Sequence, residues 1–311
     1  MRIIIVGASG LIGGALATAA SSAGHDVIGT YSTRSRPGLL RFDLTRDRLG
    51  DLVPDLGPDD AVVLMAAQID QAWIAGHVEE AHRVNVDGAI ACAEDAFSRG
   101  AHLVFMSTEA VFGAGREEGF DETALPAPLS VYARHKAEVE TFLRAGARGR
   151  WSVARTGSTV GWGDNDLHCS VSATYRTLLG PSAKMAYDNM FTVTDVTDLV
   201  AGLLQVIERK FYGFIHLAAN PPVIRTQLAD WIRGFSRFGE RIKYEAVPFS
   251  SLRLDAPRAA RAWLRNERAV RELALTFTDP QSTVRRKVER LDRTLGYELT
   301  AEIGGRTKSP R

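Results

Sequence analysis

The sequence predicts an α/β protein with a doubly wound, mostly parallel Rossmann sheet and a smaller C-terminal substrate-binding lobe. One observation is an apolar, β-branched stretch at residues 2–6 that runs directly into glycines spaced three apart. A second is the alternation of short apolar runs with amphipathic segments over the first half of the chain, which is typical of βαβ units. A third is that this alternation weakens after residue 157, where a second lobe is expected.

These patterns divide the chain of 311 residues into two parts. We assign residues 1–157 to an NAD(P)-binding Rossmann domain, with return segments at about 190–218. Residues 158–189 and 219–311 are assigned to the substrate-binding lobe.

The composition excludes several classes of protein. The chain is 45% hydrophobic and 24% charged, and its formal net charge of +1 argues against nucleic acid or an acidic membrane as a partner. The apolar run at the N-terminus is far shorter than the ~20 residues that span a membrane. Cys92 and Cys169 form no set of metal ligands, and His77 and His82 have the wrong helical spacing to share an ion. We therefore expect a cytoplasmic protein with reduced thiols and no metal.

The first strand-to-helix junction carries a phosphate-binding pattern. The absence of a Cβ atom at its glycines allows a tight turn and a close approach of a pyrophosphate to the helix N-terminus. The residues expected to contact the dinucleotide here are Gly7, Ser9, Gly10, Leu11, Ile12 and Gly13. The alternative is a glycine turn with only a structural role.

The end of the second strand, residues 25–30, discriminates between the two dinucleotides. An Asp or Glu here would bind the ribose 2′-hydroxyl of NAD, but the chain continues as Tyr31, Ser32, Thr33 and Arg34. Hydroxyl and guanidinium donors suit a 2′-phosphate, so these residues favour NADP(H), with NAD(H) still possible. The alternative is a solvated basic loop.

Two more strand ends are expected at the cofactor crevice, because the carboxyl ends of parallel strands face the ligand. Strands are predicted at residues 39–42 and 61–65. The residues that follow them are Asp43, Leu44, Ala66, Ala67 and Gln68. Asp43 either caps the next helix or accepts from the adenine amino group, and the two roles are compatible. The small residues leave room for the cofactor.

A long helix is predicted at residues 78–99. Asn85 lies on its otherwise apolar face. A polar side chain in that position indicates a buried hydrogen-bonding role.

The pair Tyr132 and Lys136 anchors the candidate active site. The apolar spacing of residues 130–148 predicts a helix, which places both side chains on one face. An ammonium beside a phenol is expected to lower the pKa of the tyrosine from ~10 and make it a usable proton donor near neutral pH. The fifth strand, residues 101–106, continues to Thr108, whose hydroxyl can bond a substrate carbonyl that Tyr132 protonates.

Together these features resemble the extended short-chain dehydrogenase/reductase superfamily. Within it, residues 106–113, 155–161 and 187–199 are similar to stretches of the dTDP-4-dehydrorhamnose reductase family. The resemblance covers nearly the whole chain. It implies an NAD(P)-dependent oxidoreductase that acts on a sugar nucleotide, and a homodimer is a further expectation from the family.

The resemblance also implies roles for single residues. Thr108 orients the substrate carbonyl, Tyr132 is the general acid, and Lys136 holds the nicotinamide ribose. Arg155 leads into the substrate side. Glu109, in the stretch 106–113, is also expected to contact the substrate. It replaces an aspartate of the family, and this departure puts the particular sugar in doubt.

The second half of the chain is expected to cover the crevice and select the substrate. The predicted elements are a sixth strand at 151–155, strand or loop at 186–194, a helix at 195–208 capped by Asp195, a strand at 213–217, a helix at 226–237 and a strand at 244–247. Trp162 is either a packing residue or a substrate contact. Arg258, Arg261, Arg265 and Arg268 predict a basic helical stripe, which is either solvated or a site for a nucleotide diphosphate.

The function expected from the sequence is NADPH-dependent reduction of a nucleotide-linked 4-keto-sugar, with Tyr132 as the general acid. One alternative is an NAD(P)-dependent epimerase or dehydratase of sugar nucleotides. An alternative of another class is a non-catalytic, NADP-binding regulatory subunit, since some relatives of this subgroup serve that way.

Overall fold

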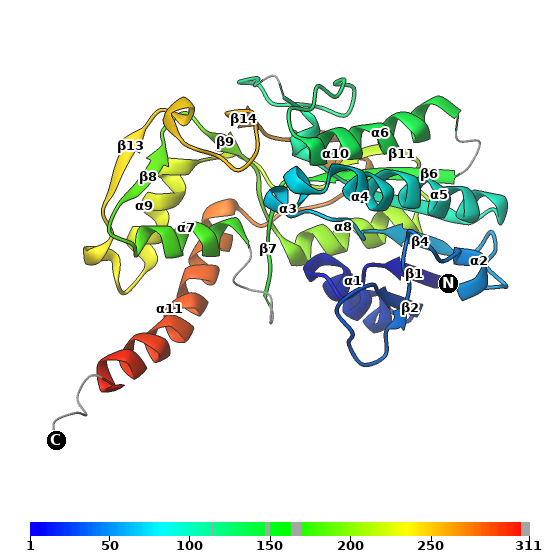
Figure 1. The fold of residues 1–311 in the computed structure, drawn as a ribbon, viewed down its shortest axis with the longest axis horizontal. Helices are drawn as coiled ribbons and strands as arrows, with labels where there is room; N and C mark the ends of the chain where they lie inside the picture. The colour runs from blue at the N-terminus through cyan, green and yellow to red at the C-terminus, as the bar shows by residue number, and fades with distance from the viewer. Residues whose placement is uncertain (114, 147–149, 163–168, 306–311) are drawn as a thin grey trace.

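A parallel sheet of seven strands forms the centre of the protein (Figure 1). The computed structural model describes residues 1–113, 115–146, 150–162 and 169–305, with side chains to residue 294. The strands are ordered β11-β6-β5-β4-β1-β2-β3, and each neighbouring pair is parallel. They are β1 (Arg2–Val6), β2 (Asp26–Tyr31), β3 (Leu40–Arg41), β4 (Ala61–Leu64), β5 (His102–Thr108), β6 (Arg150–Thr156) and β11 (Gly213–His216). The predicted Rossmann fold is confirmed.

Helices cover both faces of this sheet (Figure 1). The core on one face is built with α1 (Leu11–Ser22), α8 (Val196–Glu208) and α10 (Glu267–Leu273). The core on the other face includes α2 (Leu49–Leu52), α5 (Gly88–Ser98) and α6 (Val131–Gly146). Helices α3 (Gln71–Gly76) and α4 (Val78–His82) precede α5 on that side.

The strand order reverses between β1 and β4. From β1 the chain proceeds to β2 and β3 in one direction, and from β4 to β5, β6 and β11 in the other. Ligands of open α/β sheets bind outside the carboxyl ends of the strands at such a switch point. The fold therefore places the ends of β1, β4 and β5 around one crevice.

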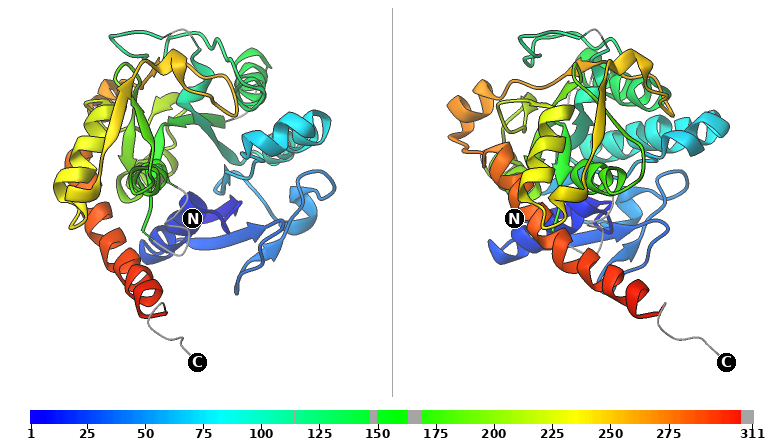
Figure 2. Two further views of the ribbon diagram at one scale, coloured as in Figure 1. Left: turned by 60° about the vertical axis from the view of Figure 1, so that its left-hand side comes forward. Right: turned by 90° about the vertical axis from the view of Figure 1, so that its left-hand side faces the viewer.

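A second lobe lies beyond the carboxyl edge of the sheet (Figures 1 and 2). Its strands are β8 (Ala183–Ala186), β9 (Met190–Phe191), β12 (Val223–Ile224), β13 (Tyr244–Val247) and β14 (Arg261–Ala262). Its helices α7 (Ser170–Leu178), α9 (Arg225–Phe235) and the start of α11 (Pro280–Gly305) share a separate apolar core. β7 (Ser158–Val160) and β10 (Val193–Asp195) pair in parallel beside it. The exact domain boundaries stay a prediction.

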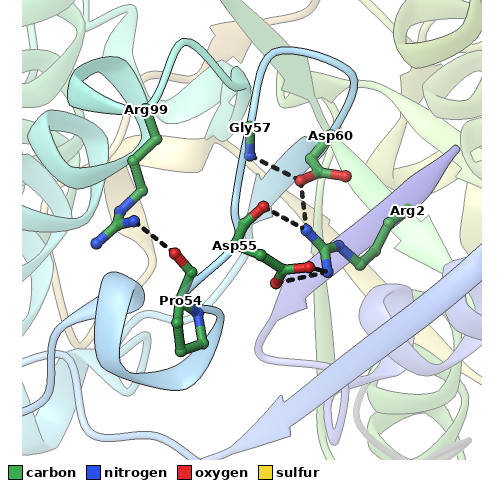
Figure 3. Close-up of polar contacts among 6 residues, drawn as sticks. All are labelled: Arg2, Pro54, Asp55, Gly57, Asp60 and Arg99. Atoms are coloured by element: carbon green, nitrogen blue, oxygen red, sulfur yellow. Dashed lines mark hydrogen bonds and ion pairs between the residues drawn. The ribbon is translucent and has the colours of Figure 1, made fainter.

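The amino edge of the sheet is held by an ion-pair cluster at the start of β1 (Figure 3). The Arg2 guanidinium donates to both carboxylate oxygens of Asp55, at 2.9 and 3.0 Å, and to Asp60 Oδ2 at 2.7 Å. Gly57 N also donates to Asp60 Oδ2, at 2.8 Å. Nearby, Arg99 bonds the carbonyl of Pro54 at 2.9 Å. These contacts tie the loops before β4 to the edge of the sheet.

The helix predicted at 78–99 is confirmed over residues 78–98, and it contains a π-helical turn, η1 (Arg83–Asp87), between α4 and α5. The predicted basic stripe is wrong, because Arg261 lies on β14 and α10 begins only at Glu267. The helical cap that we predicted at Asp195 is confirmed, since its Oδ1 accepts from Thr197 N at 2.8 Å. Residues 163–168 and the tail from 306 lie outside the described residues.

Candidate active site

The glycine loop is shaped by close backbone contacts. Gly7 has a φ of +101°, and a Cβ atom there would lie 2.8 Å from Ala66 N. A Cβ atom on Gly13 would lie 2.4 Å from Gly7 O. Gly10 caps α1 without a side-chain hydrogen bond, and no acidic residue lies in the first helical turn. The loop therefore leaves backbone N–H groups at a helix N-terminus for an anion, which fits a dinucleotide pyrophosphate.

The end of β2 lies beside this loop. Buried Thr30 accepts a hydrogen bond from Gly7 N at 3.2 Å, which links the two strand ends. Tyr31 is half-buried, while Ser32, Thr33 and Arg34 are exposed. Their donors are thus accessible for a ribose 2′-phosphate at the position that the sequence suggested.

Asp43 caps a turn of its own rather than a helix. Its Oδ1 accepts from the backbone N and the hydroxyl of Thr45, at 3.0 and 2.8 Å. These bonds hold the pKa of the Asp43 carboxyl below its usual value. Leu44 is 8% exposed and belongs to the core beneath α5, so its side chain does not face the crevice. A contact of Leu44 with the cofactor, which stays a prediction, would therefore come from its backbone.

Asn85 has the buried hydrogen-bonding role that the sequence indicated. Its Oδ1 accepts from Gln68 N at 2.7 Å, and its Nδ2 donates to Gln68 O at 2.9 Å. The π-helical turn carries this side chain, a placement often found at functional sites. Asn85 thereby fixes the loop of Ala66, Ala67 and Gln68, which follows β4 at the switch point.

Lys136 connects the start of α6 to the end of β5, the strand that carries Thr108. Thr108 is the last residue of β5, and its Oγ1 accepts from Ala110 N at 3.2 Å. Lys136 Nζ donates to the carbonyl of Met106 at 2.9 Å and lies 4.5 Å from the centre of the Phe105 ring. This bond joins the second turn of α6 to β5, two residues before Thr108.

The electrostatics of the pair differ from the prediction. Burial raises the pKa of Tyr132 to about 12. Burial also lowers the pKa of Lys136 to about 8, and the charge of Glu140 opposes this shift. The expectation that Lys136 lowers the pKa of Tyr132 is therefore wrong for this structure, because the ammonium is directed at Met106 and not at the phenol.

Arg155 does not face a substrate. Its side chain is fully buried, its Nε donates to Glu140 Oε1 at 2.9 Å, and its second nitrogen donates to Glu140 Oε2 at 2.6 Å. Its guanidinium also stacks over the rings of Phe112 and Phe214. The predicted substrate contact is corrected: alternation along β6 turns Arg155 towards α6, inside the core.

Glu109 lies at the junction of the sheet and the second lobe. Its Oε2 accepts from Thr192 N at 3.2 Å. Burial raises the pKa of Glu109 to about 8, against the charge of Arg225 across the junction. A buried carboxyl of this kind beside Thr108 is suited to a polar contact with a ligand, and that role stays a prediction.

Trp162 packs in the interior. Its ring contacts both the sheet core and the core of the second lobe, and its Nε1 donates to Asp195 Oδ1 at 3.0 Å. Arg286 on α11 bonds the other oxygen of Asp195 at 2.7 Å. Of the two roles left open by the sequence, the structure favours packing.

Sequence reasoning missed Glu140 and Thr156. Glu140 lies one helical turn after Lys136, and this spacing alone could have placed it on the same face. Thr156 pairs with Thr108 in the register of β5 and β6, so both side chains project from the same face of the sheet. Its hydroxyl is one of the few buried side-chain atoms in the described part of the chain without a hydrogen-bond partner. Only the structure reveals this.

This strand order, with a glycine turn after β1 and a Tyr/Lys pair on the helix beside β5, defines a protein of the extended short-chain dehydrogenase/reductase class. The family model described as the RmlD substrate binding domain matches residues 1–293. The chain belongs to this family, whose characterised relatives include sugar-nucleotide reductases. The resemblance seen in the sequence is confirmed.

Two relatives show the range of the family. The chain is 31% identical to a dTDP-4-dehydrorhamnose reductase of Mycolicibacterium smegmatis over 252 residues, which cover 79% of this chain and 69% of that protein. It is 30% identical to methionine adenosyltransferase 2 subunit beta of Danio rerio over 140 residues. That second match spans only 45% of this chain and 42% of the zebrafish protein.

Solved structures share the fold. A dTDP-4-dehydrorhamnose reductase of Clostridium acetobutylicum has a TM-score of 0.80 at 23% identity, covering 94% of this chain and 99% of that chain. A dTDP-4-dehydrorhamnose reductase of Bacillus anthracis in complex with NADP has a TM-score of 0.75 at 21% identity, covering 93% and 97%. A UDP-glucose 4-epimerase of Thermus thermophilus in complex with NAD has a TM-score of 0.76 at 20% identity, covering 93% and 98%.

The described residues hold no group of three or more His, Cys, Asp or Glu side chains arranged for a metal ion. None of the helices in the described ranges has the length and apolar character needed to cross a membrane.

Proposed function

We propose that the protein reduces a nucleotide-linked 4-keto-sugar with NADPH. The observation that carries the proposal is the hydrogen bond from Lys136 to Met106, which brings the Tyr132 turn of α6 to the end of β5 beside Thr108. Its support is the membership of a family that includes a dTDP-4-dehydrorhamnose reductase 31% identical to this chain.

The cofactor residues follow from the crevice. The glycine loop would hold the pyrophosphate through backbone N–H groups, and the donors from Tyr31 to Arg34 would hold the 2′-phosphate. Asp43 is assigned to the adenine. The loop from Ala66 to Gln68 is assigned to the part of the cofactor beyond the pyrophosphate. Bound NADPH would supply the hydride, and side chains of the protein would supply the proton and the hydrogen bonds to the substrate oxygen.

Tyr132 is proposed as the general acid. Its raised pKa keeps the phenol protonated at neutral pH, which is the form that reduction of a ketone requires. An alkoxide is more basic than a phenolate, so transfer of the phenolic proton to the developing alkoxide is favourable even from a buried tyrosine. Thr108 donates a second hydrogen bond to the same oxygen, and Lys136 holds the nicotinamide ribose.

A panel of nucleotide 4-keto-sugars, mixed with NADPH or NADH, tests this function. We expect at least one substrate to cause stoichiometric loss of the absorbance of the reduced cofactor, faster with NADPH. Substrate conversion without net cofactor oxidation would identify an epimerase or dehydratase instead. That reaction class is a candidate because a UDP-glucose 4-epimerase shares the fold.

A second candidate is a non-catalytic, NADP-binding regulatory subunit. One observation favours it, the match to methionine adenosyltransferase 2 subunit beta of Danio rerio. Tight NADPH binding without oxidation by any member of the panel would support this function. The presence of Thr108, Tyr132 and Lys136 together favours the reductase.

A further inference from the structure

A buried charged cluster lies directly behind Lys136. Glu140 on α6 is 1% exposed, and Arg155 on β6 is fully buried. The two form a bidentate ion pair, and Ser107 on β5 donates to Glu140 Oε1 at 2.6 Å. Arg155 also lies 3.3 Å from His216 Nε2 on β11. The cluster thus joins α6, β5, β6 and β11 beneath the candidate active site.

The spacing on α6 connects this cluster to the chemistry. Tyr132, Lys136 and Glu140 are four residues apart, so their side chains follow one face of the helix. Ser107, which bonds Glu140, immediately precedes Thr108 on β5. The Glu140 carboxylate therefore contacts β5, the strand that carries Thr108, and lies one helical turn from Lys136.

The titratable and charged groups around Lys136 and its cluster come from three elements. Tyr132, His135 and Glu140 lie on its own helix, Arg155 on β6 bonds Glu140, and His216 on β11 lies 3.3 Å from Arg155. Burial lowers the pKa of His216 to about 3, with Arg155 as a second cause, so this histidine is neutral. Glu140 is the carboxylate that opposes the desolvation of Lys136.

We propose that Glu140 is a positioning residue that keeps the Lys136 ammonium charged and holds α6 against the end of β5. The positive charge of Arg155 offsets part of the stabilisation that the Glu140 carboxylate gives to the Lys136 ammonium. This inference rests on the proposed function, because it assigns Lys136 the task of binding the nicotinamide ribose. Ser107, by bonding the same carboxylate, places Thr108 in register with that lysine.

The cost of the cluster supports a role beyond stability. A buried ion pair is often no more stabilising than apolar side chains of equal volume, because two charges have been removed from water. Here the negative partner also lies beside a second buried cation. An apolar pair at these positions would fill the same space but would leave Lys136 without a counter-charge.

The test removes the negative charge of Glu140 or the positive charge of Arg155 and compares the opposite effects on the titration of Lys136. Glu140→Gln, Arg155→Met and the double variant Glu140→Leu/Arg155→Met are compared with the unmodified chain. The titration of Lys136 is followed by NMR of protein labelled with ¹³C-lysine, with Lys136→Met used to assign the signal. The dissociation constant of NADPH is measured from pH 6 to 10 by fluorescence of the reduced nicotinamide. Asp60→Asn at the amino edge is the control.

We expect Glu140→Gln to lower the titration midpoint of Lys136 by about one pH unit or more, because a nearby negative charge is lost. Arg155→Met should raise the midpoint, because a positive charge is lost, and the double variant should lie between the two. NADPH binding by Glu140→Gln should weaken several-fold at pH 8 and recover at pH 6. The control should leave the midpoint unchanged.

Shifts of the same sign in both single variants, or an NADPH affinity reduced equally at every pH, would overturn the inference and leave only a structural role. If a single variant does not fold, the charge-conserving pair Glu140→Asp and Arg155→Lys must keep the midpoint within about half a pH unit, and a larger shift contradicts the proposal. The titration needs no substrate. It therefore separates failure of this inference from failure of the proposed function.

Discussion

The amino and carboxyl edges of the central sheet both carry ion pairs, but in different surroundings. At the amino edge, Arg2 and Asp60 are joined at 2.7 Å with side chains 18% and 11% exposed, and Asp55 beside them is open to solvent (Figure 3). At the carboxyl edge, Arg155 and Glu140 are 0% and 2% exposed. The same pairing of arginine with carboxylate is partly exposed to solvent at the amino edge and fully buried at the carboxyl edge.

The difference shows how the two edges serve the protein. The amino-edge cluster joins loops to the sheet, and its hydrogen bond to Asp60 raises the pKa of Arg2, which stays charged. At the carboxyl edge, burial raises the pKa of Tyr132 to about 12 and that of Glu109 to about 8, and it lowers the pKa of Lys136 to about 8. Perturbed groups gathered in a crevice mark a functional site better than the mere presence of charge. The following variants test this distinction.

The largest effect is expected for Tyr132→Phe. Removing the proposed general acid should lower turnover by ~10²-fold or more, since general acid catalysis contributes that much. NADPH affinity and the midpoint of thermal unfolding should stay close to those of the unmodified protein. Steady-state kinetics with the best keto-sugar check this, and unchanged turnover would remove the mechanism.

Gly10→Ala probes the cofactor loop. A Cβ atom on Gly10 would lie 3.4 Å from Gly7 O, an ordinary contact, and the backbone there is extended. The protein itself tolerates the methyl group at a cost of about 1 kcal/mol, because alanine is a poorer N-cap than glycine. We expect NADPH binding to weaken by about tenfold or more, because the methyl group occupies space needed by the pyrophosphate.

Titration of NADPH by fluorescence measures this effect. Gly234→Ala on α9, where a Cβ atom meets nothing within 4 Å, is the matched control. Equal NADPH affinities for the two variants would place the pyrophosphate elsewhere.

Asp60→Asn tests the amino edge. Loss of the charge-assisted bonds from Arg2 and Gly57 should lower the free energy of unfolding by about 1–3 kcal/mol. Turnover per folded molecule should not change, because the cluster is far from the crevice. Asp59→Asn, which alters an exposed pair with Lys210, should leave stability unchanged. A loss of turnover in Asp60→Asn would break the comparison between the edges.

The smallest effect is expected for two buried threonines whose hydroxyls have no hydrogen-bond partner among the described residues, Thr156 on β6 and Thr283 on α11. Replacement of either by valine should raise the free energy of unfolding by less than ~1 kcal/mol, since an unsatisfied polar group is removed. Only Thr156→Val should also raise the KM for the sugar, because Thr156 lies beside Thr108. Chemical denaturation and steady-state kinetics measure the two quantities. Identical kinetics for the two variants would assign Thr156 to the core.

Local sequence signals predicted much of this molecule. The strand from residue 2, the glycine turn, the strand at 244–247 and the cap at Asp195 depend on neighbours in the chain, and the structure has them there. Asn85 was also anticipated, because a polar residue on an apolar helix face needs a partner.

The remaining features depend on packing that a single sequence does not display. Arg155 was expected at the substrate, but Glu140, fifteen residues earlier, buries it against α6. The ammonium of Lys136 was expected beside Tyr132, but the carbonyl of Met106 holds it. The arginines after Pro257 have helical spacing, yet Arg261 lies on strand β14, which pairs with β9 of the second lobe. In each case contacts with distant segments of the chain decide where the side chain lies.

The stoichiometry of NADPH oxidation decides whether the protein is a reductase. With a nucleotide 4-keto-sugar in limiting amount, we expect one NADPH to be oxidised for each sugar converted, and this oxidation to be lost in Tyr132→Phe. NADPH that binds tightly and is never oxidised, or sugar that is converted while the absorbance of NADPH stays constant, would contradict this expectation.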